Sequence, residues 1–504
     1  MKKALALLMA LLMLAMTACA GGGGAADTTA APTTTSPTDT AAEPETTADP
    51  TLRENAKDGI PADLKFAGET VRIIYRDATH IKTYNVIGTE NIGDFVTDSV
   101  WARNRKVEER LGVTLDIQPT ANGDLKACRE EIKTALLSGV SEADFYIATC
   151  NSSVQASINQ CLYDLGQLKY IDLNQPWWWM GAIEELSVDG ETYPYLIGDI
   201  MLDDYFRMGT IYYNKNLYEA QFGNPDELYN AVLDGSWTLE RLAQISEQCY
   251  TDLNGDQRAD ESDRYGFIIS KTKQESDIHF LVGCDLTMYT RNADEHVQID
   301  MNNERMLKAL DDLKALYTTN AGAYTSTTGM DASSAFFANG GAIFYPSRLS
   351  SAVDENLRKM EAAYGILPYP KLDAAQEEYV SLIHSSSCDL FMPNSVPAER
   401  LDMVGAVIEA MAAESYRSVV PAFLDSALKV KYSRDELSGQ VIDMVIAGAN
   451  KNFVFEYSPQ TSNIISNALD HIYGKASFSS TYSALAKAAQ KSLDRFVDSL
   501  QPAA

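Results

Sequence analysis

The chain has 504 residues, of which 45% are hydrophobic, so it is long enough to bury more than one core. It carries 70 Asp and Glu residues against 41 Lys and Arg residues, which gives a formal net charge of -29. Because a body this acidic repels phosphates, the charge excludes nucleic acid and anionic lipid as partners held through the overall field.

Residues 1–19 have the pattern of an export signal. Two lysines precede an almost unbroken apolar run at 4–16, which is too short to cross a bilayer as a helix. Two small residues then precede Cys19, an order that resembles the bacterial lipobox, although Met16 stands where Leu is usual. We expect residues 1–18 to be removed and Cys19 to be lipidated, which anchors the chain to the outer face of the cell membrane. A plain secretory signal with an incidental cysteine is the alternative.

A low-complexity tract follows the cysteine. It is rich in Ala, Thr, Pro and acidic residues as far as about Pro50, and it lacks the aromatic and branched apolar residues that offset chain entropy. We expect residues 19–63 to form a disordered tether and the folded body to begin near Leu64.

The remaining cysteines are widely scattered and show no paired metal-type spacing. A chain this long does not need disulfides to fold, and the even count still permits them in a connectivity that the sequence cannot choose. We expect mostly free, buried thiols at Cys128, Cys150, Cys161, Cys249, Cys284 and Cys388.

Strands and helices alternate in the first part of the body. The apolar runs at 70–75, 113–117 and 144–148 predict strands, and helices are predicted at 97–111, before Gly112, and at 124–137. This order indicates a parallel sheet covered by helices, in which ligands bind at the carboxyl ends of the strands.

A second set of elements follows. Thr238 can cap a helix that begins at Leu239. Further strands are predicted at 210–214, 266–270, 342–345 and 364–367, and late helices at 400–413, 434–447 and 480–500.

Several short motifs occur in one order along the chain: DFYI at 144–147, YYNKNLY at 212–218, SWT at 236–238, FFANGGAIF at 336–344 and YGILP at 364–368. In this order they resemble the extracellular solute-binding proteins of the maltose-binding type, which are the receptors of ABC importers. ARNRKVEER at 102–110 and PAFLDSALKVKYSRD at 421–435 resemble the large clostridial lipoproteins of that class.

The resemblance implies a periplasmic-binding-protein-like fold of two α/β lobes that close on a ligand by a hinge. It places lobe 1 at 64–195 with 380–422, and lobe 2 at 196–379 with 423–504. It implies a monomer that delivers a small solute to ABC permease subunits and performs no catalysis.

A saccharide site needs aromatic faces together with amides, carboxylates and arginines for the hydroxyls. Residues of these types stand at predicted loop positions, although each alone is more often an ordinary loop or core residue. The tryptophans at 177–179 and Trp237 are better explained as core residues than as a stacking platform. The candidate ligand residues are Tyr75, Arg76, Asp77, Asn151, Asp203, Asp204, Tyr205, Tyr345 and Arg348.

An acidic loop at 252–263 has oxygen side chains at alternating positions, as calcium loops do. It departs from the EF-hand pattern because Gln257 stands at the turn-glycine position and Asp263 replaces the bidentate Glu. A solvated acidic turn is the alternative to a structural Ca²⁺ site. The candidate ligands are Asp252, Asn254, Asp256, Arg258, Asp260 and Asp263.

The sequence offers no support for an enzyme beyond its many carboxylates. The five histidines stand alone, His384 included, and there is no nucleophile elbow, P-loop or dinucleotide fingerprint. We therefore expect no catalytic cofactor and a mono- or oligosaccharide as ligand. An oligopeptide or other solute is the alternative, as is a surface lipoprotein that processes or adheres to carbohydrate.

Overall fold

The computed structural model describes residues 52–77, 86–88, 90, 93–140, 142–149, 160–270, 272, 274–292, 296–326, 329–425 and 436–500. All of these described residues belong to one compact unit. Cys19, Cys150 and Asn151 lie outside the described residues, so the predictions for them stay predictions.

The first sheet has the strand order β2-β1-β3-β13-β4. β1 (Thr70–Tyr75) pairs in parallel with β2 (Thr114–Pro119) and β3 (Phe145–Thr149), as the alternating pattern predicts. β13 (Cys388–Phe391) pairs antiparallel with both β3 and β4 (Tyr195–Leu196). The three predicted strands are therefore parallel, as expected, but the sheet as a whole is mixed, because a short strand from much later in the chain inserts into it.

The second sheet has the order β11-β5-β10-β6-β9. β10 (Ala342–Arg348) lies between β5 (Gly209–Asn214), which is antiparallel to it, and β6 (Tyr265–Ile269), which is parallel. β11 (Tyr364–Leu367) pairs antiparallel with β5, and β9 (Ala323–Thr325) pairs in parallel with β6. Two small pairs complete the strands: β12 (Ser381–Leu382) with β14 (Ala449–Asn450), and β7 (Tyr289–Arg291) with β8 (Val297–Ile299).

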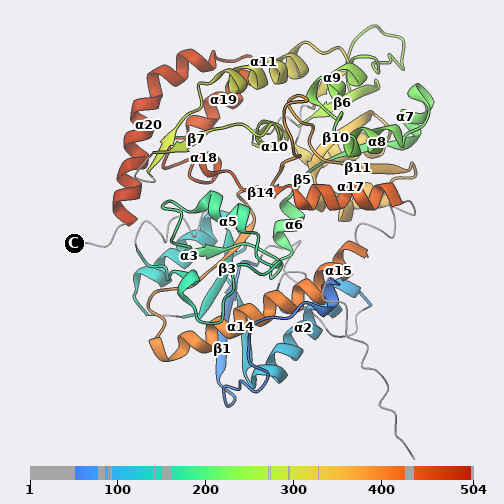
Figure 1. Cartoon of the computed structure of the whole chain (residues 1–504). Coiled ribbons are helices and arrows are strands. Elements are labelled where there is room, and N and C mark those ends of the chain that lie inside the picture. Colours follow the sequence, from blue (N-terminus) through green and yellow to red (C-terminus); the bar gives the residue numbers. More distant parts are fainter. Residues whose placement is uncertain are drawn as a thin grey trace, which may run out of the picture. The chain divides into compact units, whose positions relative to one another are not determined.

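The helix predicted at 97–111 begins two residues earlier than expected and ends where Gly112 predicts. α2 (Phe95–Leu111) starts at Asp94, whose carboxylate accepts two backbone N–H bonds, and ends at Gly112 in the left-handed conformation. α14 (Leu401–Glu414) packs beside α2 (Figure 1). The chain also forms η1 (Arg53–Asn55), α3 (Leu125–Leu137), η3 (Leu165–Gln167), α5 (Met180–Leu186), η5 (Ala398–Arg400), the π-helical turn η6 (Ser415–Val419) and α15 (Val420–Phe423).

Thr238 caps α9 (Leu239–Glu247) through the backbone N–H of Arg241, as predicted. α6 (Asp203–Arg207) precedes β5, and α10 (Ser276–Gly283) follows β6. The other helices are α7 (Lys215–Phe222), α8 (Glu227–Leu233), α11 (Glu304–Thr318), α12 (Met330–Ala338), η4 (Leu349–Val353), α13 (Glu355–Lys359), α17 (Glu436–Ala447), α18 (Phe453–Glu456), α19 (Ile464–Ile472) and α20 (Phe478–Leu500).

The core confirms two predictions about side chains. Trp177 and Trp237 are completely buried, and the Trp237 indole donates to the carbonyl of Pro368. Cys128, Cys161, Cys249, Cys284 and Cys388 are free thiols, and all but Cys161 are buried.

The chain passes between the two sheets in the stretch from Leu196 to Gly209 and returns between β12 and β13. The sheets thus agree with a two-lobed organisation, while the lobe boundaries given above stay a prediction. One limit of the tether is corrected: residues 52–63 are part of the folded unit, where Arg110 of α2 pairs with Asp58. Among the described residues, no helix is both long and apolar enough to span a membrane.

Candidate functional site

Polar side chains meet where β1, β6 and β10 end. Arg76 follows β1, Glu275 follows β6, and Arg348 is the last residue of β10. Arg207 at the end of α6 and His384 after β12 join them. We call Arg76, Arg207, Glu275, His279, Arg348 and His384 the interlobe cluster.

The connection between β12 and β13 joins the two halves of the cluster. Arg76 donates from Nη1 to the carbonyl of Ser386 at 3.4 Å and from Nε to the carbonyl of Gly123 at 3.1 Å. His384 has its Nδ1 2.9 Å from Ser386 Oγ and its Nε2 2.9 Å from the carbonyl oxygen of Gln274. A continuous path of hydrogen bonds therefore runs from the end of β1 to the loop after β6.

Arg348 organises the half of the cluster that belongs to the second sheet. Its Nη2 forms an ion pair with Glu275, and its Nε donates to Nε2 of His279 at 3.4 Å. Burial and the charge of Arg348 lower the pKa of His279 and of His384 well below the usual value, so both imidazoles are neutral. Burial raises the pKa of Glu275, and the positive charges of Arg348 and Arg207 partly oppose this rise.

Arg207 ties the cluster to the first sheet. Its Nε lies 3.3 Å from Asp203 Oδ1, and the other oxygen of Asp203 accepts the backbone N–H of Cys388 in β13 at 2.9 Å. Asp203 and Asp204 are both completely buried, and burial raises the pKa of Asp204 well above the usual value. These two predicted ligand residues therefore lie in the buried support beneath the cluster.

The structure brings together only part of the predicted ligand set. Arg76 and Arg348 both belong to the cluster, and half-buried Asp77 is next to Arg76. The three predicted aromatic residues are packed against other parts of the protein. Tyr75 is buried, Tyr345 stacks on Phe337, and Tyr205 contacts Trp179 edge-on.

Arg207 and Glu275 are not among the residues predicted from the sequence. Arg207 lies in the stretch that connects the sheets, and Glu275 lies in the loop after the predicted strand at 266–270, at the carboxyl edge where ligands bind. Its position after the carboxyl end of a predicted strand could have identified Glu275 as a candidate ligand residue. The side chains of Arg207, Glu275 and His384 are each partly exposed, so the cluster reaches solvent through them. Its guanidinium, carboxylate and neutral imidazole groups can donate to and accept from hydroxyls.

The acidic loop closes on itself through its own backbone. Asp252 accepts the N–H groups of Gly255 and Gln257, and Gln257 adopts the left-handed conformation at the position where an EF-hand has glycine. Buried Asp263 accepts from the backbone N–H of Leu253. Among the described residues, no group of three or more His, Cys, Asp and Glu side chains is arranged to hold a metal ion. Calcium binding by this loop stays a prediction.

The chain is similar in structure to known proteins, whereas the sequence comparisons found no match. No family model and no curated protein matches the chain. The sugar-binding protein MalE from Xanthomonas citri superposes with a TM-score of 0.56 at 16% identity, over 86% of this chain and 97% of that one. An ABC transporter solute-binding protein from Thermotoga lettingae bound with α-D-tagatose gives 0.52 at 15%, over 85% and 100%. UgpB from Mycobacterium tuberculosis in complex with glycerophosphocholine gives 0.53 at 16%, over 79% and 96%.

These neighbours define the class of fold. The chain has the two-lobed α/β fold of the periplasmic-binding-protein type, as the sequence resemblance implies. The interlobe cluster lies at the carboxyl ends of strands from both sheets, the position at which open α/β sheets bind ligands.

Proposed function

We propose that this chain is the extracytoplasmic solute receptor of an ABC importer and captures a small solute by closing its lobes. The observation that supports this most is the interlobe cluster, in which Arg76 from one sheet is linked to Arg348 and Glu275 from the other. A ligand that bridges these groups gains its contacts only when the lobes come together, so binding energy favours the closed form.

A mono- or oligosaccharide is the ligand class that we favour. Guanidinium and carboxylate groups recognise hydroxyls well, and similar structures carry tagatose, maltotriose and ribitol. One similar structure carries glycerophosphocholine instead, which keeps another small solute as the alternative, together with an oligopeptide. The function needs no catalytic step or cofactor. Surface adhesion to carbohydrate, or its processing, is the competing function.

The receptor is best placed beside its transporter. We propose that lipidated Cys19 holds the chain at the outer face of the cell membrane, that it works as a monomer, and that its lobes contact the permease subunits. Proposed ligand contacts are Arg76, Asp77, Arg207, Glu275, Arg348 and His384; the earlier residues Tyr75, Asn151, Asp203, Asp204, Tyr205 and Tyr345 remain predictions as ligand contacts.

Arg76→Met should weaken binding of the saccharide that a thermal-shift panel of maltotriose, maltose, tagatose and ribitol selects. The substitution removes a largely buried guanidinium at the cluster, and we expect affinity to fall about tenfold or more by calorimetric titration. Arg72→Met is the matched control, because it removes a half-exposed arginine from the other end of the same strand. Equal affinity for the two variants would contradict the proposed site, and a response to tri-alanine with none to any saccharide would favour the peptide alternative.

The calcium prediction has its own test. If the loop at 252–263 binds Ca²⁺ as a structural ion, millimolar calcium should raise the melting temperature relative to the same protein in chelator. Asp256→Asn should reduce that rise. An unchanged melting temperature means that the loop is a solvated acidic turn.

A further inference from the structure

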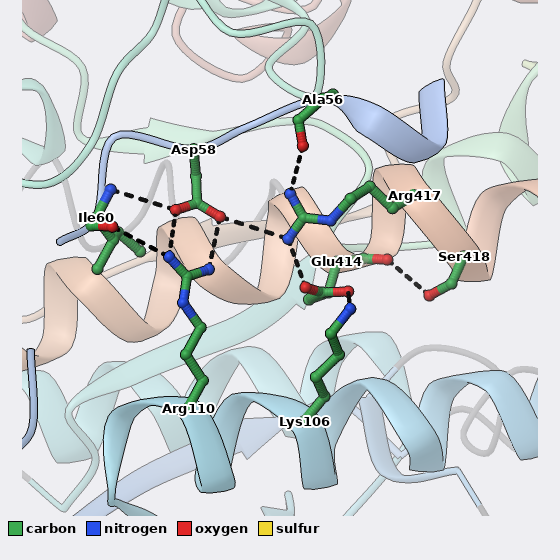
Figure 2. Close-up of polar contacts among 8 residues, drawn as sticks. All are labelled: Ala56, Asp58, Ile60, Lys106, Arg110, Glu414, Arg417 and Ser418. Atoms are coloured by element: carbon green, nitrogen blue, oxygen red, sulfur yellow. Dashed lines mark hydrogen bonds and ion pairs between the residues drawn. The ribbon is translucent and has the colours of Figure 1, made fainter. Parts of the chain in front are cut away.

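The N-terminal segment of the folded unit contains a buried carboxylate. Asp58 receives a bidentate pair from Arg110 of α2, with N–O distances of 2.7 and 2.6 Å (Figure 2). Arg417 of η6 approaches the same carboxylate at 3.4 Å and donates to the carbonyl of Ala56 at 2.8 Å. Burial alone raises the pKa of Asp58, but the Arg110 hydrogen bonds and the two positive charges outweigh it and lower the pKa.

Two further ion pairs, both with Glu414, continue this network across α2 and α14. Glu414 accepts from Arg417 at 2.5 Å and from Lys106 at 2.8 Å (Figure 2). Paired arginine–carboxylate contacts with buried partners hold a segment far more firmly than exposed ones do. Residues 53–60 are thus fixed to α2 and η6, and we call them the strap.

The start of the strap reaches a different part of the fold. Arg53 lies 4.2 Å from the ring centre of Tyr416 in η6, and its Nη1 is 3.6 Å from Asp199 Oδ2. Asp199 is 2% exposed and stands in the stretch that carries the chain from β4 to β5. Among the described ion pairs, Arg53 is its one cationic partner.

Asp199 in turn holds the residues around that passage. Its Oδ1 accepts the Tyr205 hydroxyl of α6 at 2.8 Å and the Trp179 indole N–H at 3.0 Å. The centre of the Tyr205 ring lies 5.7 Å from that of the Phe423 ring in α15. α15 is the last helix before residues 426–435, which lie outside the described residues. Arg53, Asp199, Tyr205 and Phe423 therefore form one line of contacts from the strap to two connecting segments.

We propose that the strap is a conformational clasp: its docking through Arg53 and Asp199 fixes α6 and α15, and so couples the position of the N-terminal segment to the passage between the lobes. When the strap undocks, Asp199 stays buried without its cationic partner Arg53, and the hydrogen bond from Tyr205 to Asp199 is no longer held in place. A pull on the N-terminal segment then loosens the connection on which lobe movement depends.

Ionisation of Asp199 is part of the coupling. Burial raises its pKa to about 6, while the charge of Arg53 and the hydrogen bonds from Tyr205 and Trp179 oppose the rise. The titratable groups that face it are Arg53 from η1 and Tyr205 from α6, whose own pKa is raised by burial. The ion pair is therefore present above about pH 6 and absent well below it.

Hydrogen exchange measured on the ligand-free full chain tests the clasp, so a failed ligand screen leaves this test intact. Arg53→Met should speed exchange in peptides covering 199–208 and 416–423 by about fivefold or more at about pH 8, and have little effect at about pH 5. Lys57→Met is the matched control. Lys57 is an exposed cation of the same segment, and Lys57 itself takes part in none of the described ion pairs.

A second variant separates the coupling from simple loss of folding. In the Asp199→Asn background the charge that Arg53 neutralises is gone, so adding Arg53→Met should change exchange at 199–208 by less than about twofold. Faster exchange confined to residues 53–60 in the single variant would overturn the proposal, since the strap would then be an anchor with no link to α6. Equal effects of Arg53→Met in both backgrounds would overturn it as well.

Discussion

Replacing Glu409 with Gln should make the protein more stable at alkaline pH, by about 3 kcal/mol at about pH 9. Glu409 lies in α14, is completely buried and accepts the Trp178 indole N–H at 2.9 Å. Burial raises its pKa from 4.5 to about 8 against the opposing hydrogen bonds, so the folded protein keeps a proton that the unfolded chain has already released. The stability that this carboxyl contributes is fully present below about pH 4.5 and is lost as the pH rises through about 8.

Glutamine keeps the shape and the acceptor oxygen of Glu409 and carries no charge, so it removes this loss. Urea unfolding at about pH 5, 7 and 9 should show the variant's advantage growing with pH and nearly vanishing at the acid end. Glu377→Gln serves as the control, since it neutralises an exposed carboxylate. A constant difference between Glu409→Gln and the unmodified protein at all three pH values would show that Glu409 does not hold the buried proton.

Arg103→Met should be the most damaging substitution in α2, with a loss of about 3 kcal/mol or more in unfolding free energy. Arg103 is completely enclosed, and burial lowers its pKa to about 9. Its guanidinium donates to the carbonyl of Ile200, to Ser415 Oγ and to Asn104 Oδ1. Methionine fills much of the space but leaves these buried acceptors without their donor.

Arg105→Met is the matched control for this loss. Arg105 is half exposed on the same helix and pairs only with Glu108 one turn away among the described ion pairs. Pairs of this kind contribute little, so we expect a change within about 0.5 kcal/mol by urea unfolding. If Arg103→Met lowered the unfolding free energy by an equally small amount, the structural role assigned to the buried Arg103 guanidinium would be contradicted.

Local patterns predicted the regular elements well. β1 spans the apolar run at 70–75, α3 matches the helix predicted at 124–137 with Asp124 as its cap, and Thr238 caps α9 as predicted. β13 was not predicted from the sequence, because its partner strands lie far away along the chain and a four-residue strand is too short to show a periodicity.

The strap and the candidate site were harder to predict for a related reason. The composition of residues 52–63 indicates a tether, yet Asp58 is fixed by Arg110 and Arg417, which no local pattern links to it. The candidate site likewise depends on Arg207 and Glu275, which belong together only once α6 and the loop after β6 are folded. The aromatic residues expected at the site, Tyr75, Tyr205 and Tyr345, are buried, because a ring gains more from packing than from exposure. Their role as ligand contacts stays a prediction.

Small-angle X-ray scattering with and without a saturating saccharide tests the central claim most directly. If the interlobe cluster captures the solute, the radius of gyration should decrease when that saccharide is added, and Arg76→Met should need about tenfold more saccharide or more for the same decrease. Binding detected by calorimetry with an unchanged radius of gyration would contradict capture by lobe closure.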